Sequence, residues 1–491
     1  MIKKLSGMVA CILTFFAILA MTFFMMQTIS LHILTNDLLA YISLFLILIG
    51  ILLLWLCHKR NHGVMLVISI ISSILISVAF TYAGCFLDKM HHTIENMVNQ
   101  SDEVNVVSVI TTKNSPIETI QDLEHKHIAS VELGDYKTQL QALAQIDKEI
   151  DDYEHSKTTD YVKHIRRLLN EEVDAILLNE SAHGLMYSFF PNFDNQVKII
   201  KQYEFLKDHQ NLMKSKDLSS EAFNVYITGM DTYGSLEKVS RSDVNLIVTI
   251  NPKTHQILIT GLPRDYYIPQ TCQLNQKDKL THTGMFGVDC TIQSVEQFMD
   301  IDLNYFARVN FSSLLDVVDA FDGIDVYSDY SFTTRYGNYE VFKGMNHFTG
   351  DQALGFVRER YEVPRGDLDR SVNQMRTLTA IIDKATSHEM IMRYSDVLEA
   401  ISGCFQTNMT YDEVSKFVKG QVKNFNEWDI KHIQLTGEGA TEWTPANGFY
   451  AYVMIPDDTA VKNAQYLINQ VLQNHKLSDE DIKQHEQIVR P

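Results

Sequence analysis

Three apolar stretches without a charged residue fill most of the first 87 residues and constrain the fold more than any other feature. They run from 5 to 36, from 38 to 57 and from 64 to 87. Each is long enough for a helix that crosses the hydrocarbon core of a bilayer, which takes roughly 20 residues. The sequence therefore predicts three transmembrane helices within residues 1–87 and a large aqueous part, residues 88–491, that works next to a membrane.

The charges of the loops predict an orientation for these helices. Lys3 and Lys4 precede the first stretch, and Lys59 and Arg60 separate the second from the third, whereas Asp37 is the charge between the first two. Basic loops remain in the cytoplasm. We therefore expect a multi-pass protein of the cell membrane with a cytoplasmic N-terminus and residues 88–491 outside the cytoplasm.

Two other interpretations of this region have less support. The first stretch alone would also suit a cleaved signal peptide, but two further spans follow it. Residues 82–85 (YAGC) weakly match a lipid-attachment site, although Tyr82 occupies a position where leucine is usual.

The charge balance limits the partners of the aqueous part. The formal net charge is −19, and the first 87 residues are basic, so the remainder is more acidic still. Because contacts to phosphates supply most of the nonspecific affinity for nucleic acid, we expect no nucleic-acid partner. An anionic substrate would need a local basic cluster, and a divalent metal would suit it.

The cysteines beyond the apolar stretches are Cys272, Cys290 and Cys404. Three cysteines do not make the framework of a disulfide-stapled domain. A bridge between Cys272 and Cys290 and a set of free thiols therefore both remain open.

The aqueous part divides by composition and periodicity. Strand-like runs at Val104–Ile110, His127–Val131 and Asp174–Leu178 alternate with helix-like runs at Gln139–Ile150 and Asp160–Leu169 and predict a small α/β accessory domain. The predicted order of segments is a polar stalk 88–103, the accessory domain 104–204, a linker 205–221, a main domain 222–387, a C-terminal part 388–475 that packs on it, with strands at Lys431–Leu435 and Phe449–Ile455, and a loose tail 476–491.

Three predicted strands bring charged residues together in the main domain. They cover Ala222–Met230, Val244–Ile250 and Gln256–Leu262. In an antiparallel meander the strand ends alternate, so one edge would hold Asp231, Arg241, Asp243, Arg264 and Asp265. Mg²⁺ binds carboxylates together with substrate phosphates, and the arginine fork matches phosphate oxygens.

Further polar side chains point to the same chemistry. Two arginines two residues apart share one side of a strand, and two residues four apart share one stripe of a helix. These candidates are Arg358 with Arg360, Arg370 with Gln374, and the single cations Lys279 and Arg308. Each alone is an ordinary surface pattern, but so many cations near two convergent aspartates in an acidic body favour a polyphosphate site.

Six short motifs in this order resemble the LytR-CpsA-Psr family of Gram-positive envelope proteins. The resemblance covers roughly 222–387, and three spans before an accessory domain resemble the capsule-locus members of that family. The motifs are Gly229-Met230-Asp231, Arg241-Ser242-Asp243, Pro263-Arg264-Asp265, Lys279-Leu280-Thr281-His282, Phe356-Val357-Arg358-Glu359-Arg360 and Asp367-Leu368-Asp369-Arg370 with Gln374.

The resemblance implies an α/β/α sandwich with a mixed central sheet and an apolar pocket for a prenyl chain. It implies transfer of capsular polysaccharide from undecaprenyl pyrophosphate to peptidoglycan, with other capsule-assembly proteins as possible partners. Asp231 and Asp243 would hold Mg²⁺ (or Mn²⁺). Arg241, Arg264, Lys279, Arg358, Arg360 and Arg370 would bind the pyrophosphate, with Gln374 in support. Arg264, Asp265, Arg358 and Arg360 would be catalytic, and whether Asp265 or Asp243 takes the acceptor proton stays open.

Three alternative functions remain. A regulator of capsule expression is one, although the short predicted cytoplasmic segments leave no room for a DNA-binding module. A hydrolase of the lipid pyrophosphate would use the same site with water as the acceptor. A scaffold for capsule assembly would use the accessory domain to bind other proteins.

Overall fold

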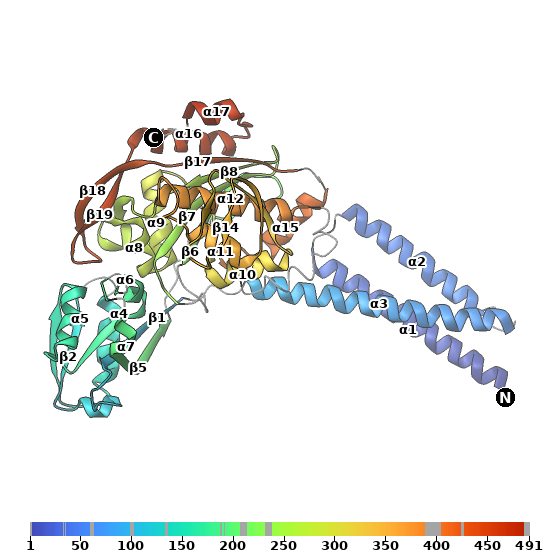
Figure 1. The fold of residues 1–491 in the computed structure, drawn as a ribbon. Coiled ribbons are helices and arrows are strands. Elements are labelled where there is room, and N and C mark those ends of the chain that lie inside the picture. Colours follow the sequence, from blue (N-terminus) through green and yellow to red (C-terminus); the bar gives the residue numbers. More distant parts are fainter. Residues whose placement is uncertain are drawn as a thin grey trace.

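The computed structural model describes residues 2–32, 34, 36–58, 63–98, 103–132, 136–186, 189–190, 192–206, 214–230, 238–387, 404–423 and 427–485. Figure 1 shows three parts: a set of long N-terminal helices, a small domain and a larger domain. This arrangement confirms the predicted mixed α/β class with three apolar helices before it.

The three N-terminal helices are α1 (Ile2–Ser30), α2 (Asn36–His58) and α3 (Gly63–Val98). Each contains a stretch long and apolar enough to cross a membrane. The polar residues 88–98, predicted as a stalk, continue helix α3 toward the larger domain.

The accessory domain is a five-stranded sheet with the order β3-β2-β4-β1-β5. Ile176 and Leu178 point to the face that α5 covers, whereas Leu177 points to the face that α4 covers. Its elements are β1 (Val104–Thr112), β2 (His127–Val131), α4 (Tyr136–Ile146), β3 (Glu154–Thr158), α5 (Tyr161–Leu169), β4 (Ala175–Asn179), α6 (His183–Met186), α7 (Phe193–Gln196) and β5 (Val197–Leu206), with short 3₁₀ turns at Ile120–Leu123 and Glu180–Ala182.

The larger domain is built on a six-stranded sheet with the order β16-β11-β6-β7-β8-β17. The predicted meander is confirmed, because β6 pairs antiparallel with β7 and β7 with β8. β11 and β17 join it in parallel, so the sheet is mixed. Its strands are β6 (Phe223–Met230), β7 (Ser242–Asn251), β8 (Gln256–Gly261), β11 (Tyr305–Val309), β16 (Gln406–Thr407) and β17 (Asp429–Gln434).

Helices cover both faces of this sheet and complete an α/β/α sandwich. Because side chains alternate along a strand, Ile247 points to the layer of α9 and α16, whereas Leu246 and Val248 point to the layer of α12 and α15. The remaining elements are β9 (Tyr267–Gln270), β10 (Gln276–Lys279), α8 (Leu280–Thr283), α9 (Val288–Met299), α10 (Phe311–Ala320), β12 (Ile324–Ser328), β13 (Phe332–Thr333), β14 (Glu340–Val341), β15 (Gly344–Phe348), α11 (Gly350–Arg358), α12 (Asp367–Ala385), α15 (Tyr411–Lys423), β18 (Gly437–Thr444), β19 (Phe449–Pro456), α16 (Asp458–Leu472) and α17 (Asp479–His485), with 3₁₀ turns at Thr271–Gln273 and Gly284–Phe286.

The C-terminal part is woven into the same sheet rather than laid on its outside, since it supplies β16 and β17. The prediction of a loose tail from residue 476 is wrong as far as residue 485. Leu477 and Ile482 are buried in the main core, which holds α17 in place despite its polar sequence.

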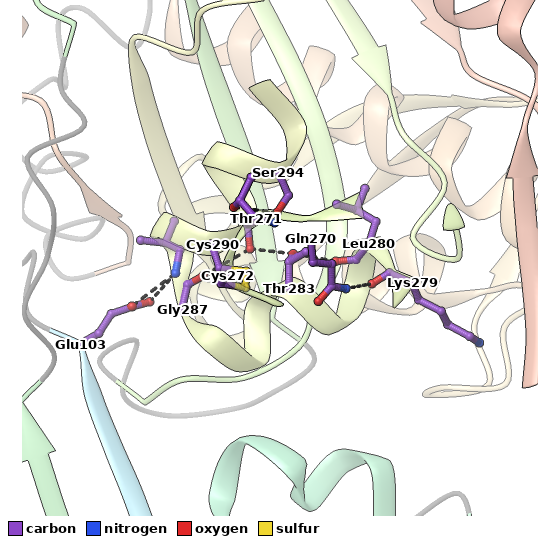
Figure 2. Close-up of a disulfide and its surroundings, with 12 residues drawn as sticks. Glu103, Gln270, Thr271, Cys272, Lys279, Leu280, Thr283, Gly287, Cys290 and Ser294 are labelled. Carbon is purple, nitrogen blue, oxygen red and sulfur yellow. Dashed lines mark hydrogen bonds between the residues drawn. A yellow bond between two sulfur atoms is a disulfide. The ribbon is translucent and has the colours of Figure 1, made fainter. Parts of the chain in front are cut away.

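A buried ion pair ties the start of the accessory domain to the larger domain. Glu103 is fully buried and pairs with Arg308, which is 2% exposed. The carboxylate of Glu103 also accepts a 3.0 Å hydrogen bond from the backbone of Val288, where α9 begins (Figure 2). Arg308, one of the candidate phosphate ligands, therefore serves a structural pair.

The two cysteines that the sequence left open form a disulfide, Cys272–Cys290. Figure 2 shows the bridge between the turn after β9 and helix α9, close to Gly287. The hydroxyl of Ser294, also on α9, accepts a 3.1 Å hydrogen bond from the backbone of Thr271. The bridge therefore fixes the β9–β10 hairpin, which ends at Lys279, against α9.

Candidate functional site

The predicted edge of the meander exists and positions four of its five charged residues. The pairing of Leu246 with Gly261 brings the start of β7 beside the end of β8. The chain leaves β8 through Leu262, whose backbone donates a 2.9 Å hydrogen bond to Asn245, and reaches Arg264 and Asp265. The edge thus holds Arg241, Asp243, Arg264 and Asp265, whereas Asp231 lies outside the described residues.

Asp243 is the buried centre of this edge, with 8% exposure. Its Oδ1 lies 2.9 Å from Nη1 of Arg264 and accepts a 2.7 Å hydrogen bond from the hydroxyl of Thr281. Its Oδ2 lies 4.0 Å from Nη2 of Arg241. Burial favours the neutral acid, but Arg264, Arg241 and Arg370 hold the pKa of Asp243 well below its usual range. Asp243 is therefore a carboxylate at physiological pH.

Asp265 and Lys279 form a second pair. Nζ of Lys279 lies 2.9 Å from Oδ1 of Asp265, and Nε of Arg264 lies 3.9 Å from Oδ2. The backbone of Thr281 donates a 2.8 Å hydrogen bond to the carbonyl of Arg264, which holds the start of α8 against this segment. Lys279, a candidate phosphate ligand, thus lies beside the meander edge.

A third carboxylate, Asp367, completes the cluster and was not among the predicted site residues. It is the first residue of α12, and its Oδ1 lies 2.9 Å from Nη2 of Arg370 and 3.9 Å from Nη1 of Arg360. Its Oδ2 lies 3.9 Å from Nε of Arg264. The spacing of three residues to Arg370 on a predicted helix start carried the signal, because such residues are neighbours on a helix surface. Thr281 was missed as well, and only the fold places it beside Asp243.

The prediction that Arg358 and Arg360 share one side of a strand is wrong. Thr349 and Gln352 form a capping box that starts helix α11, and Arg358 is its last residue. The guanidinium of Arg358 lies 4.2 Å from the ring centre of Phe311. The spacing of two residues between the arginines misled the assignment, since the same spacing occurs where a helix ends and a loop begins.

Arg360 reaches the cluster from a loop instead. The carboxylate of Glu359 accepts hydrogen bonds from the backbone of Arg360 at 2.9 Å and of Tyr361 at 2.8 Å, which fixes the loop. Gln374 does not contact the carboxylates of the cluster in this arrangement; its Nε2 donates a 3.3 Å hydrogen bond to the carbonyl of Val357. Gln374 thereby joins α12 to the last turn of α11.

Positive charge exceeds negative charge among the described residues of this cluster. Burial is the main cause that lowers the pKa of Arg370; Asp367 opposes it, and Arg264 and Arg360 lower it further. The cations are Arg241, Arg264, Lys279, Arg360 and Arg370, and the carboxylates are Asp243, Asp265 and Asp367. Five cations against three anions in an acidic protein make a site for a ligand with more than one negative charge.

The donor set at Asp243 also fits a divalent cation. Its Oδ2 is buried and has no hydrogen-bond donor within the described part of the chain. A carboxylate oxygen of this kind is a ligand that Mg²⁺ accepts, together with phosphate oxygens. No group of three or more acidic, histidine or cysteine side chains able to hold a metal occurs among the described residues, so oxygens of a bound phosphate would have to complete the coordination.

Known proteins share the larger domain. A sequence profile of the LytR_cpsA_psr family matches residues 187–469. A protein of Bacillus mycoides named polyisoprenyl-teichoic acid–peptidoglycan teichoic acid transferase TagU is 35% identical over 255 residues, which cover 51% of this chain and 79% of the relative. The protein of that name in Bacillus cereus is 36% identical over 259 residues, covering 52% and 82%.

A solved structure, B. subtilis TagV, aligns with a TM-score of 0.44 at 25% identity and covers 52% of this chain and 99% of that one.

Proposed function

Because the chain belongs to the LytR-CpsA-Psr family, we propose that it transfers a glycan from a polyisoprenyl pyrophosphate carrier to peptidoglycan. The observation that carries the proposal is the cluster at Asp243, in which cations outnumber carboxylates. A pyrophosphate supplies the missing negative charge. The similar Bacillus proteins are named for the transfer of teichoic acid from a polyisoprenyl carrier to peptidoglycan, which is the same type of reaction.

The polymer we propose is a capsular polysaccharide on undecaprenyl pyrophosphate. Support comes from the three spans and the accessory domain, which resemble the capsule-locus members of the family. Other capsule-assembly proteins would then be partners of the accessory domain. The basic loops predict that residues 88–491 lie outside the cytoplasm, where peptidoglycan is.

Phosphoryl transfer depends mainly on positioning and on stabilisation of charge. Arg264 and Arg370 would hold the phosphate oxygens, and Arg360 and Lys279 would bind from the two sides of the cluster. A hydroxyl of the acceptor attacks the phosphorus that bears the glycan, the bond from this phosphorus to the bridging oxygen breaks, and the lipid phosphate leaves. The same cations would stabilise the charge that develops on the leaving phosphate.

Asp265 is the better candidate to take the proton of the acceptor hydroxyl. The arginines around Asp243 hold its pKa well below the usual range, which makes it a weak base. Asp243, with Asp231, would instead hold Mg²⁺ (or Mn²⁺), which supplies positive charge to the phosphates when bound. Its buried Oδ2 accepts no hydrogen bond from the described residues and is open for this role.

The test is transfer by the full chain in detergent. A labelled glycan on a polyisoprenyl pyrophosphate is offered with peptidoglycan, with Mg²⁺ or with EDTA. We expect labelled peptidoglycan in Mg²⁺ and a loss of roughly 100-fold or more in EDTA and in Asp243→Ala and Arg264→Ala. Arg376→Ala is the matched control, because Arg376 lies on α12 like Arg370 but pairs with Asp329 at 2.8 Å.

Two outcomes would contradict the proposal. Release of the glycan phosphate at an equal rate with and without peptidoglycan would show a hydrolase. Equal activity of Arg264→Ala and Arg376→Ala would show that the cluster does not bind the reacting phosphates.

A further inference from the structure

One face of the β18–β19 hairpin carries a row of exposed aromatic rings. Trp443 pairs with Tyr450, and Thr441 pairs with Tyr452. Because alternate residues of a strand share a face, Trp443, Tyr450 and Tyr452 all lie on the same side. They are 44%, 67% and 53% exposed, and the rings of Trp443 and Tyr450 are in edge contact at 5.7 Å.

The opposite face of the hairpin does the packing. Val453 and Thr444 are fully buried there, and Phe449 contacts the ring of Phe189 in the accessory domain at 5.1 Å. The exposed row is therefore not needed to attach the hairpin. Large aromatic side chains that gather on an open face mark a binding surface more often than scattered ones do.

The aromatic row begins beside the cluster of charged residues at Asp243. The backbone of Met454 donates a 2.7 Å hydrogen bond to the carbonyl of Asp265, and the hydroxyl of Tyr267 donates a 2.8 Å bond to the carbonyl of Trp443. Nζ of Lys279 lies 6.0 Å from the ring centre of Tyr452. The segment that carries the site thus also positions the aromatic row.

Gly439 allows the innermost ring to lie across the hairpin. A side chain at Gly439 would place its Cβ 3.0 Å from Cε2 of Tyr452. Glycine here leaves the ring of Tyr452 against the backbone of β18, beside Lys279. The row therefore leads from Tyr452, beside Lys279, to the cross-strand pair of Tyr450 and Trp443.

We infer that these three rings form a platform for the sugar rings of the donor glycan, an inference that rests on the proposed function. Sugar rings present C–H groups that pack on the negative face of an aromatic ring. A glycan joined to a phosphate beside Lys279 must leave the site next to Tyr452, so the donor is already tethered at the start of the row. An effective concentration of this kind makes weak stacking contacts productive.

The place of the hairpin argues against the other common partner of exposed tyrosine and tryptophan, the membrane interface. Figure 1 shows β18 and β19 at the end of the larger domain that is opposite to α1, α2 and α3. The hairpin that carries the row therefore lies away from the three apolar helices.

The experiment compares two donors with the full chain in detergent: a polyisoprenyl pyrophosphate that carries one sugar and one that carries the oligosaccharide. We expect the double variant Trp443→Ala/Tyr450→Ala to raise KM for the long donor roughly tenfold relative to the short one, with kcat for the long donor within about twofold of wild type. The control is Tyr466→Ala, an aromatic residue on α16 with 50% exposure, which we expect to change neither KM.

A direct binding measurement separates this inference from the proposed function. The free oligosaccharide is titrated while the fluorescence of Trp443 is followed, with Trp443→Phe as the blank. A response that is lost in Tyr450→Ala supports the platform even if no transfer occurs. Equal KM changes for both donors, or a rise in the KM for peptidoglycan alone, would overturn it.

Discussion

Two arginine–carboxylate pairs of the protein use the same groups in different surroundings. Glu103 and Arg308, here called the sealed pair, are both buried and bind each other, and the carboxylate also accepts a hydrogen bond from the backbone of Val288. Asp243 is also buried and Arg264 is partly buried, yet Oδ2 of Asp243 has no hydrogen-bond donor among the described residues and further cations surround the pair. The comparison teaches that a buried ion pair that finds all its partners within the protein has a structural role. An ion pair with excess positive charge around it and a carboxylate oxygen that accepts no hydrogen bond indicates a ligand site instead.

The largest effect on stability should come from the sealed pair. Arg308→Met leaves Glu103 charged and buried, and we expect it to cost about 3–5 kcal/mol in the free energy of unfolding. Chemical denaturation of the full chain in detergent measures this. The double variant Glu103→Gln/Arg308→Met should recover part of the loss, and a double variant no better than the single one would contradict the view that an unpaired charge is the cause.

Arg264 should show the reverse pattern. Arg264→Ala removes a group that is proposed to hold the transferred phosphate, so we expect transfer to fall roughly 10²- to 10³-fold. Stability should fall less than in Arg308→Met, because relief of repulsion among Arg241, Arg264 and Arg370 offsets part of the loss at Asp243. Arg264→Lys should restore little, since lysine lacks the planar fork. Loss of folding equal to that in Arg308→Met would erase the distinction between the two pairs.

The disulfide next to the sealed pair should have an intermediate effect. Cys272 and Cys290 are 18 residues apart, and a closed loop of this length stabilises by about 3 kcal/mol. Cys272→Ser/Cys290→Ser should have a lower melting temperature than the oxidised wild type, whether or not reductant is present. Reductant should lower the melting temperature of the wild type and leave that of the double variant unchanged. Cys85→Ser, at an exposed free cysteine, is the control. A melting temperature of Cys272→Ser/Cys290→Ser equal to that of Cys85→Ser would show that packing alone holds α9.

The sequence predicted the three apolar helices, the meander and most of the cluster. It did so because strand alternation and strand ends depend on local pattern, and Asp243, Arg264 and Asp265 lie at strand ends. It was wrong at Arg358 and Arg360, where α11 ends and a loop follows, although Thr349 and Gln352 give a local signal for the start of that helix.

The ion-pair partner of Arg308 could not be predicted from the local sequence. Its sequence, Ala307-Arg308-Val309, is that of any strand cation, and its partner Glu103 lies 205 residues away. No local pattern links residues so far apart. The polar tail likewise gave no sign that Leu477 and Ile482 enter the main core.

The smallest predicted effect concerns His183 in the accessory domain, a partly exposed histidine that lies beside two carboxylates. His183 lies 3.4 Å from Glu180 and 2.9 Å from Asp194. The hydrogen bond to Glu180 is the main cause that raises the pKa of His183 to about 9. A pKa that is higher in the folded protein gives stability that is full below the unfolded value of about 6.5 and is lost as the pH rises through about 9.

His183→Gln should therefore destabilise the protein at about pH 6 and hardly at all at about pH 10. Solvent screening at this partly exposed site limits the difference to about 1 kcal/mol. Melting curves of wild type and variant across this range measure it. A gap that stays constant with pH would show that the ring of His183, which is in edge contact with Phe193 at 6.2 Å, stabilises by packing instead of charge.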